Sequence, residues 1–308
     1  MPTLASNTYD CLVIGGGPAG LTAAIYLARF HLRVAVVDAG ASRALLIPQT
    51  RNHAGFPEGI SGCALLERMR EQAVQYGAEV FADAVEALER RDEGFIATAR
   101  NSVFTARAVL LATGVVNRRP PMLDDASHVR ALAEGLLRYC PICDGYEVTD
   151  QRVAVLGTGE RGCNEATFLR GYTRTVTLVA PEGGHDFSPD QIASLREAGI
   201  EIAGTCQAIS LQEKEIALDL EDGRRLFDTL YPALGSDVRS ELAGQVGADL
   251  SGEGCLLVDA HQRTSLPGLY AAGDVVLGLD QISHAMGEGG VAATTIRNDL
   301  ARRSPLRR

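Results

Sequence analysis

The chain has 308 residues with 29 basic and 39 acidic side chains, which gives a formal net charge of −10. At roughly 150 residues per domain this length predicts two domains, and 46% hydrophobic with 22% charged residues exclude a disordered or collagen-like chain. The acidic balance also argues against a nucleic-acid partner, because phosphates are normally met by a basic surface.

The first 40 residues have the pattern of one βαβ unit. Residues 9–14 and 33–37 are short apolar runs that predict strands, and residues 21–30 between them have helical composition. A glycine-rich turn joins the first strand to this helix. The same region lacks the basic, apolar and small-residue order of a secretory signal, so we expect a cytoplasmic protein.

A membrane span is not expected either. The most apolar stretch, Cys11 to Ala28, is interrupted by four glycines and by Pro18. The chain has seven cysteines, an odd number, and without an export signal this argues against a structural disulfide framework. Any disulfide is therefore expected to be functional.

The segments up to residue 121 complete the first predicted domain. Residues 64–76 have helical character with paired charges, and residues 80–105 break into short alternating runs that predict an antiparallel meander. Residues 108–112 form a continuous apolar strand. The composition then changes at residues 117–121, Asn-Arg-Arg-Pro-Pro, which predicts the first domain boundary.

A second βαβ unit follows. Residues 153–156 and 175–179 predict strands, and a helix-compatible stretch between them runs to Arg170, so the two units form an internal repeat. A strand-rich stretch then ends in the apolar run 226–234. The last predicted element is a long helix from about residue 281 to residue 300.

A Gly-x-Gly-x-x-Gly turn occupies the first strand-to-helix junction. Gly15, Gly17 and Gly20 form it, and Asp38 ends the next strand 23 positions after Gly15. Such glycines let the backbone approach a pyrophosphate at a helix N-terminus, and an acid at that spacing accepts hydrogen bonds from a ribose hydroxyl. The turn therefore predicts a bound dinucleotide, although a glycine-rich turn can also serve packing alone.

The same pattern recurs at Gly157, Gly159 and Gly162, with a different sequence after it. The residue 23 positions after Gly157 is Ala180, and residues 181–186 contain no arginine. An NADP phosphate needs a guanidinium nearby, and Glu182 would repel it. This second turn favours NADH over NADPH, or has lost its nucleotide altogether.

Cys140 and Cys143 stand three apart before this second turn, at a predicted helix start. A helix N-terminus stabilises a thiolate, and Pro141 is tolerated in the first turn, so the spacing indicates a dithiol that cycles. Half of a zinc site is the alternative, but a structural zinc takes four ligands and the sequence has no second such pair. Asp144 either moves protons for these thiols or forms an Asp-Gly turn.

Five motifs occur in an order that resembles the low-molecular-weight thioredoxin reductases, from about Tyr9 to Leu300. They are Gly-x-Gly-x-x-Gly at 15–20, Ala-Thr-Gly at 112–114, Cys-x-x-Cys-Asp at 140–144, Gly-x-Gly-x-x-Gly at 157–162 and Ala-Ala-Gly-Asp at 271–274. The Cys pair directly before the second nucleotide motif makes the match specific among the flavin disulfide reductases. The resemblance also implies a homodimer.

The resemblance implies an α/β fold of two Rossmann-like three-layer ββα domains, one inserted into the other. Residues 1–119 and 233–308 would form a discontinuous FAD-binding domain. Residues 120–232 would form an NAD(P)-binding-like domain that carries the Cys pair.

The same resemblance implies the cofactor site. The glycine turn and Asp38 would hold the adenosine end of FAD, Asn52 would lie near the flavin ring, and Asp274 would bind the ribityl chain. The implied FAD-binding residues are Gly15, Gly17, Pro18, Ala19, Gly20, Asp38, Asn52, Thr113, Gly114, Gly273, Asp274, Gln281 and Ile282, with Gly157, Gly159 and Gly162 for a pyridine nucleotide. No metal-binding residue is expected.

The implied activity is FAD-dependent electron transfer to or from a substrate disulfide through the Cys pair. Cys143 would be the flavin-proximal thiol, Cys140 would exchange with a thioredoxin-like protein or a small dithiol or disulfide, and Asp144 would be the acid-base group. The family's basic segment is replaced by residues 180–182, and Asp280 stands where arginine is expected. These departures disfavour NADPH and leave open a dithiol oxidase that reduces oxygen, or a non-catalytic flavin redox sensor.

Overall fold

The computed structural model describes residues 8–91, 94–304 and 306. The chain forms two compact units. The first unit contains the segments before Thr50, from His53 to Val116 and after Asp237, and the second contains the rest. The chain passes between them along β7 (Val115–Asn117) and β14 (Ser236–Val238), which pair with each other.

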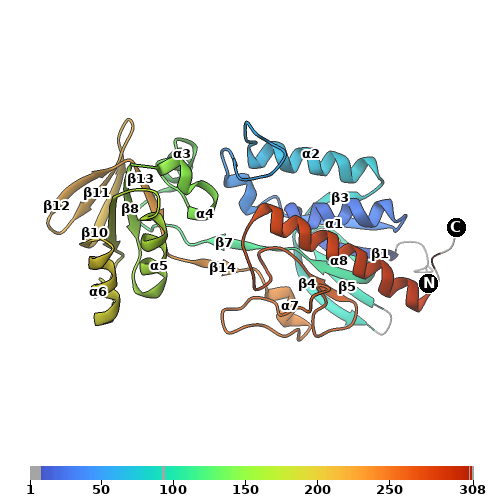
Figure 1. The fold of residues 1–308 in the computed structure, drawn as a ribbon. Helices are drawn as coiled ribbons and strands as arrows, with labels where there is room; N and C mark the ends of the chain where they lie inside the picture. The colour runs from blue at the N-terminus through green and yellow to red at the C-terminus, as the bar shows by residue number, and fades with distance from the viewer. Residues whose placement is uncertain (1–7, 92–93, 305, 307–308) are drawn as a thin grey trace. The chain divides into compact units, whose positions relative to one another are not determined.

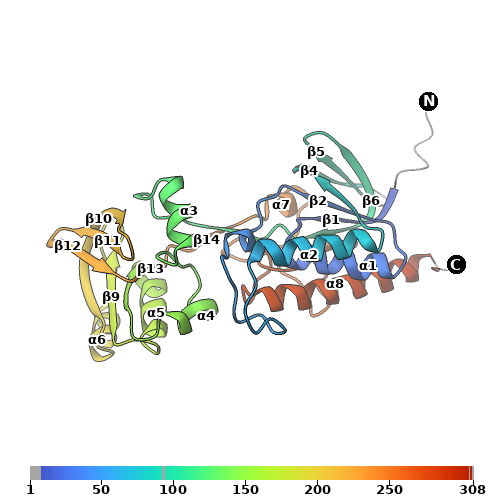
Figure 2. The same cartoon turned by 90° about the horizontal axis from the view of Figure 1, so that it is seen from above.

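The first unit is built on a seven-stranded sheet with the order β3-β2-β1-β6-β5-β4, in which β15 pairs with β6. Its strands are β1 (Thr8–Ile14), β2 (Val34–Asp38), β3 (Glu79–Ala82), β4 (Val85–Arg91), β5 (Gly94–Ala99), β6 (Val103–Leu111) and β15 (Leu269–Ala271). Its helices are α1 (Pro18–Arg29), α2 (Gly62–Gln75), α7 (Glu241–Gln245) and α8 (Ile282–Arg303), with the 3-10 turn η1 (Arg43–Leu46). Helices α1, α2 and α8 lie together beside the parallel strands in Figures 1 and 2.

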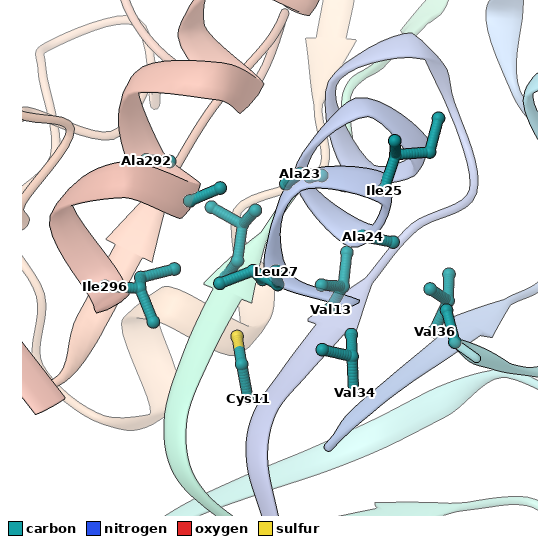
Figure 3. Close-up of a cluster of buried hydrophobic side chains, with 14 of the residues drawn as sticks. Cys11, Val13, Ala23, Ala24, Ile25, Leu27, Val34, Val36, Ala292 and Ile296 are labelled. Carbon is teal, nitrogen blue, oxygen red and sulfur yellow. The ribbon is translucent and has the colours of Figure 1, made fainter. Parts of the chain in front are cut away.

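The side chains of β1 alternate between two cores because successive residues of a strand point to opposite faces. Cys11 and Val13 pack with apolar residues of α1 and α8 (Figure 3). Leu12 and Ile14 pack on the other face against the β4–β6 meander and α7. Both faces of the strand are buried, which explains its continuous apolar sequence. The glycine turn therefore begins directly after a buried strand end at Ile14.

The second unit is built on a six-stranded sheet with the order β12-β11-β10-β9-β8-β13. Its strands are β8 (Arg152–Leu156), β9 (Thr175–Ala180), β10 (Glu201–Leu211), β11 (Ile216–Leu220), β12 (Gly223–Phe227) and β13 (Thr229–Pro232). Its helices are α3 (Asp125–Ala133), α4 (Pro141–Asp144), α5 (Gly159–Leu169) and α6 (Pro189–Glu197), with the 3-10 turn η2 (Gly145–Val148). Helices α5 and α6 share a core with β8, β9 and β13, so this unit repeats the βαβ plan of the first.

Most of the predicted elements are confirmed. The runs at 9–14, 153–156 and 175–179 are β1, β8 and β9, and the predicted last helix is α8. The helix at 64–76 is α2, shifted by two residues at its start. These elements have long periodic patterns, which explains why the sequence predicts them.

Two predictions about strands were wrong in detail. The run 108–112 is not a separate strand, because β6 continues from the meander, pairing antiparallel with β5 and parallel with β1. Strand β3 pairs parallel with β2 instead of joining the meander, whose turn residues Asp92 and Glu93 lie outside the described residues. The run 226–234 is divided at Asp228, whose carboxylate accepts a hydrogen bond from the Arg152 backbone at 2.7 Å.

Gly289 allows α8 to approach α1 closely, and its replacement tests this packing. A Cβ at Gly289 would overlap the carbonyl oxygen of Ala19, whereas a Cβ at Gly287 on the same helix meets nothing within 4 Å. We expect Gly289→Ala to lower the free energy of unfolding by roughly 1–3 kcal/mol. Gly287→Ala should raise it by up to about 1 kcal/mol, as alanine normally does in a helix. Urea denaturation followed by circular dichroism measures both, and equal effects would contradict this packing.

Candidate active site

The two cysteines of the Cys-x-x-Cys motif form a disulfide with their Cα atoms 5.2 Å apart. Cys140 is the N-cap of α4, and its Sγ accepts a hydrogen bond from the Cys143 backbone at 3.1 Å. Pro141 occupies the first turn, where its missing N–H costs nothing. The predicted helix start is therefore present, but the helix is a single turn that continues into η2.

Asp144 ends this turn and is held by two partners in the interior of the second unit. Its Oδ2 accepts from Arg138 Nη1 at 3.0 Å, and its Oδ1 accepts from the Tyr231 hydroxyl at 2.7 Å. Burial raises the pKa of Asp144, although the charge of Arg138 and the Tyr231 hydrogen bond oppose that rise. A carboxyl that keeps its proton to higher pH than an ordinary aspartate is suited to acid-base chemistry beside thiols.

Glu165 also belongs to this cluster, although the sequence analysis did not identify it. Its charge interacts with those of Asp144 and Arg161, and burial raises its pKa to about 7. The helical pattern of the sequence could have indicated Glu165, because this residue lies on the same face of α5 as the buried Gly162, Ala166 and Leu169. A carboxylate on the apolar face of a helix is uncommon, and the charge of Asp144 adds to the rise in the pKa of this one.

The second glycine turn is built as predicted but is fastened to a neighbouring loop. A Cβ at Gly162 would lie 2.8 Å from the backbone of Gly157, so these glycines allow α5 to pack closely on β8. Thr158, the N-cap of α5, accepts a hydrogen bond on its hydroxyl from the Asp186 backbone at 2.6 Å and leaves the helix without a side-chain cap. The loop that follows β9 therefore lies against the turn.

The first glycine turn has the geometry of a phosphate cradle. Gly15 has a φ of 111°, and a Cβ there would overlap the carbonyl oxygen of Ala112. Gly20 is buried in α1, and a Cβ there would overlap the Gly15 carbonyl. Gly17 is the N-cap of α1 without a side-chain cap, followed by Pro18 and the buried Ala19. The first amides of α1 are therefore open to a phosphate, and this turn fits the FAD that the motif order implies.

Asp38 lies beside this turn at the end of β2. Its Oδ1 accepts from the Gly40 backbone at 3.1 Å, and its Oδ2 accepts from Arg70 at 2.5 Å. A Cβ at Gly16 would overlap the side chain of Asp38, so this side chain lies against Gly16. The structure thus brings Asp38 next to the glycine turn, where a ribose would be bound.

Most of the remaining predicted FAD residues lie at the ends of β6 and β15 and the start of α8. Gly273 has a φ of 79°, and its N–H donates to Glu288 at 2.7 Å. Asp274 accepts from Arg43 at 2.7 Å, and the other Arg43 nitrogen lies 3.1 Å from Asp280. Sequence reasoning did not identify Arg43 or Glu288.

Five further predicted positions complete the description. Gln281 is the N-cap of α8 and Ile282 its first residue, while Thr113 donates through its hydroxyl to the Arg239 carbonyl at 2.6 Å, next to Gly114 with a φ of 66°. Asn52 falls in the second unit instead of with the other FAD residues, and its side-chain nitrogen donates to the Ile142 carbonyl at 3.5 Å. The described residues contain no group of three or more acidic, His or Cys side chains arranged to hold a metal ion.

Comparison with known proteins places these motifs in a family. A model of the pyridine nucleotide-disulphide oxidoreductases matches residues 9–289. The thioredoxin reductase of Streptomyces coelicolor is 34% identical over 288 residues, which cover 88% of this chain and 87% of that protein. The crystal structure of HlmI aligns with a TM-score of 0.87 at 28% identity, covering 96% and 93% of the two chains. Thioredoxin reductase from Streptococcus pyogenes aligns with a TM-score of 0.85 at 25% identity, covering 97% and 100%.

These matches confirm the predicted α/β fold and the resemblance in motif order. Membership of the family implies FAD and a pyridine nucleotide as cofactors. No helix in the described part of the chain is long and apolar enough to cross a membrane. The chain belongs to the pyridine nucleotide-disulphide oxidoreductase family and is a flavin-dependent disulfide oxidoreductase similar to the thioredoxin reductases.

Proposed function

We propose that the chain transfers electrons between FAD and the disulfide of a thioredoxin-like protein or of a small molecule through Cys140 and Cys143. The observation that carries this proposal is the Cys140–Cys143 disulfide with the partly buried, hydrogen-bonded Asp144 carboxyl next to it in the chain. Relatives of similar length are thioredoxin reductases, which supports a thioredoxin-like substrate. Reduced FAD, when bound, would supply the electron pair that opens this disulfide, and transfer of that pair to the substrate disulfide would re-form it.

The residues divide between binding and exchange. We propose that residues 1–119 and 233–308 hold FAD and that residues 120–232 hold the Cys pair and the pyridine nucleotide. The FAD-binding set is the one implied by the motif order, with Asn52 as its least supported member because it falls in the second unit. Cys140 would attack the substrate disulfide, Cys143 would resolve the mixed disulfide, and Asp144 would exchange protons with the thiols.

The nucleotide donor is proposed to be NADH in preference to NADPH. The loop of residues 181–188 carries Glu182 and has no arginine. The Asp186–Thr158 hydrogen bond fastens this loop to the second glycine turn. A nucleotide bound at that turn would meet an acidic segment, whereas the added phosphate of NADPH needs a cation.

Anaerobic bleaching of the visible flavin band tests the donor. We expect NADH to bleach the protein with an apparent affinity about tenfold or more above that of NADPH, because like charges repel at this loop. Glu182→Arg should reduce that preference by improving NADPH binding. Glu213→Arg, the same charge change at another exposed position of the second unit, should leave it unchanged. Rapid bleaching of the unaltered protein by NADPH would contradict this interpretation of Glu182.

The same titration separates the reductase from the alternative of a dithiol oxidase. A protein that is bleached by a dithiol, is indifferent to both nucleotides and is reoxidised by oxygen would be a dithiol oxidase. Flavin binding without turnover for any donor and acceptor would indicate the redox sensor. A homodimer and a cytoplasmic location are part of the proposal through the family resemblance.

A further inference from the structure

Arg43 in the first unit links two aspartates of the chain segment between β15 and α8. Its Nη2 lies 2.7 Å from Asp274 Oδ2, and its Nη1 lies 3.1 Å from Asp280 Oδ2. The Arg43 and Asp274 side chains are 25% and 19% exposed, so this ion pair is largely removed from water. A planar guanidinium has donors in several fixed directions, so one arginine can hold two carboxylates at once.

The backbone that carries Arg43 is held in place by helix α2. Arg43 is the first residue of η1, and the next residue, Ala44, is buried in a core with Leu65 and Leu66 of α2. A Cβ at Gly62, where α2 begins, would overlap the Ala44 carbonyl oxygen, so the helix starts directly against η1. The guanidinium therefore comes from a segment whose position is set by packing.

The turn that carries Asp274 is fixed in a similar way. The Val276 N–H donates to the Gly273 carbonyl at 2.8 Å, and the Gly273 N–H donates to Glu288 on α8 at 2.7 Å. Val275, next to Asp274, is fully buried. These contacts set the backbone of Asp274, and the ion pair with Arg43 orients its side chain.

Asp280 gives the arginine its second contact. Burial and the charge of Asp274 raise the pKa of Asp280, whereas the charge of Arg43 lowers it. Two aspartates that repel each other are stabilised by a cation between them. Asp280 directly precedes Gln281, the N-cap of α8. Arg43 thus joins the turn of Asp274 to the start of α8, two stretches that both contain predicted FAD-binding residues.

We propose that Arg43 and Asp280 are positioning residues for FAD: Asp280 orients the Arg43 guanidinium, which holds the Asp274 carboxylate for the ribityl hydroxyls. This inference rests on the proposed FAD-binding role of Asp274. A carboxylate has about four acceptor sites on its two oxygens, so Asp274 can accept from Arg43 and from ligand hydroxyls at the same time.

The release of FAD from the loaded protein tests this arrangement. Stepwise dilution, with free FAD followed by its fluorescence, gives the Kd for FAD. We expect Arg43→Met to raise this Kd roughly tenfold, because the Asp274 carboxylate loses its partner. Asp280→Asn should raise it roughly threefold, since Arg43 still contacts Asp274. Arg43→Lys keeps the charge without the planar fork, so its Kd should fall between that of wild type and that of Arg43→Met.

A double variant separates positioning from a general effect of charge. FAD carries a negatively charged pyrophosphate, so loss of an acid would by charge alone tighten FAD binding in every background. Positioning instead predicts that Asp280→Asn weakens FAD binding when Arg43 is present. Added to Arg43→Met, the same substitution should lower the Kd about threefold, because it then removes the repulsion of Asp274. Tighter binding in both backgrounds would overturn the role of Asp280.

Arg263→Met is the matched control, because Arg263 also contacts two aspartates of the first unit. It lies 2.8 Å from Asp299, in the C-terminal part of α8, and 3.4 Å from Asp259. We expect this variant to melt at a lower temperature than wild type, as measured by circular dichroism, but to bind FAD with an unchanged Kd. An equal rise in the Kd for Arg263→Met and Arg43→Met would overturn the inference, because general destabilisation would then account for both.

Asp274→Ala distinguishes failure of this inference from failure of the assigned site. We expect it to raise the Kd for FAD tenfold or more. A raised Kd in Asp274→Ala beside an unchanged Kd in Arg43→Met would overturn the inference alone. An unchanged Kd in Asp274→Ala would overturn the proposed FAD-binding role of Asp274, and the inference with it.

Discussion

Cys143→Ser is expected to lower the rate of disulfide reduction by roughly a thousandfold or more, because a mixed disulfide on Cys140 then has no thiol to resolve it. The two sulfurs are bonded in the structure, and no other cysteine is paired in the described chain. The variant keeps Cys140, so it should accumulate a covalent adduct with its substrate. Turnover is measured by thiol release, and the adduct by mass spectrometry under non-reducing conditions.

Cys140→Ser separates the roles of the two sulfurs. It should lose turnover to the same extent but form no stable adduct, because the attacking thiol is missing. Cys63→Ser, at an exposed free cysteine on α2, should behave as wild type. Stable adducts on Cys140→Ser and none on Cys143→Ser would reverse the assignment, and full turnover of Cys143→Ser would remove the pair from the reaction.

The local parts of the fold follow from the sequence because their causes are local. The strand at 9–14 is buried on both faces, so its apolar run marks it without knowledge of its neighbours. Gly15 needs a positive φ and Gly20 a close backbone approach, which only glycine permits, so the fingerprint reports geometry directly. The proximity of Cys140 and Cys143 is also local, since only two residues of the first turn of α4 separate them.

The rest of the site depends on contacts between distant segments, which periodicity does not encode. Tyr231 reaches Asp144 across 87 positions, and Arg43 reaches Asp274 across 231. Their sequence neighbourhoods resemble those of any strand tyrosine or loop arginine. Likewise, the Asp186–Thr158 hydrogen bond exists only because the loop after β9 folds back on the glycine turn, and the sequence shows the acidic loop but not its attachment.

The second large effect is expected at Asp144, because its carboxyl directly follows Cys143 in the chain. Asp144→Asn keeps the shape and the acceptor for Tyr231 but removes the exchangeable proton. We expect it to slow reduction of an alkyl disulfide by about 10²- to 10⁴-fold, the usual range for loss of a general acid. Stopped-flow thiol release measures the rate, and Asp125→Asn, at an exposed side chain of α3, is the control.

The pH dependence of this reaction has a defined direction. Burial raises the pKa of Asp144, so its protonated form persists to higher pH than that of an ordinary aspartate and is lost as pH rises through the raised value. The Tyr231 hydroxyl stabilises the ionised form, so Tyr231→Phe should move the inflection to higher pH with a small change in the maximal rate. Asp144→Asn should lack the inflection. A shift to lower pH in Tyr231→Phe would show that the hydroxyl stabilises the protonated acid instead, and would assign the titration to another group.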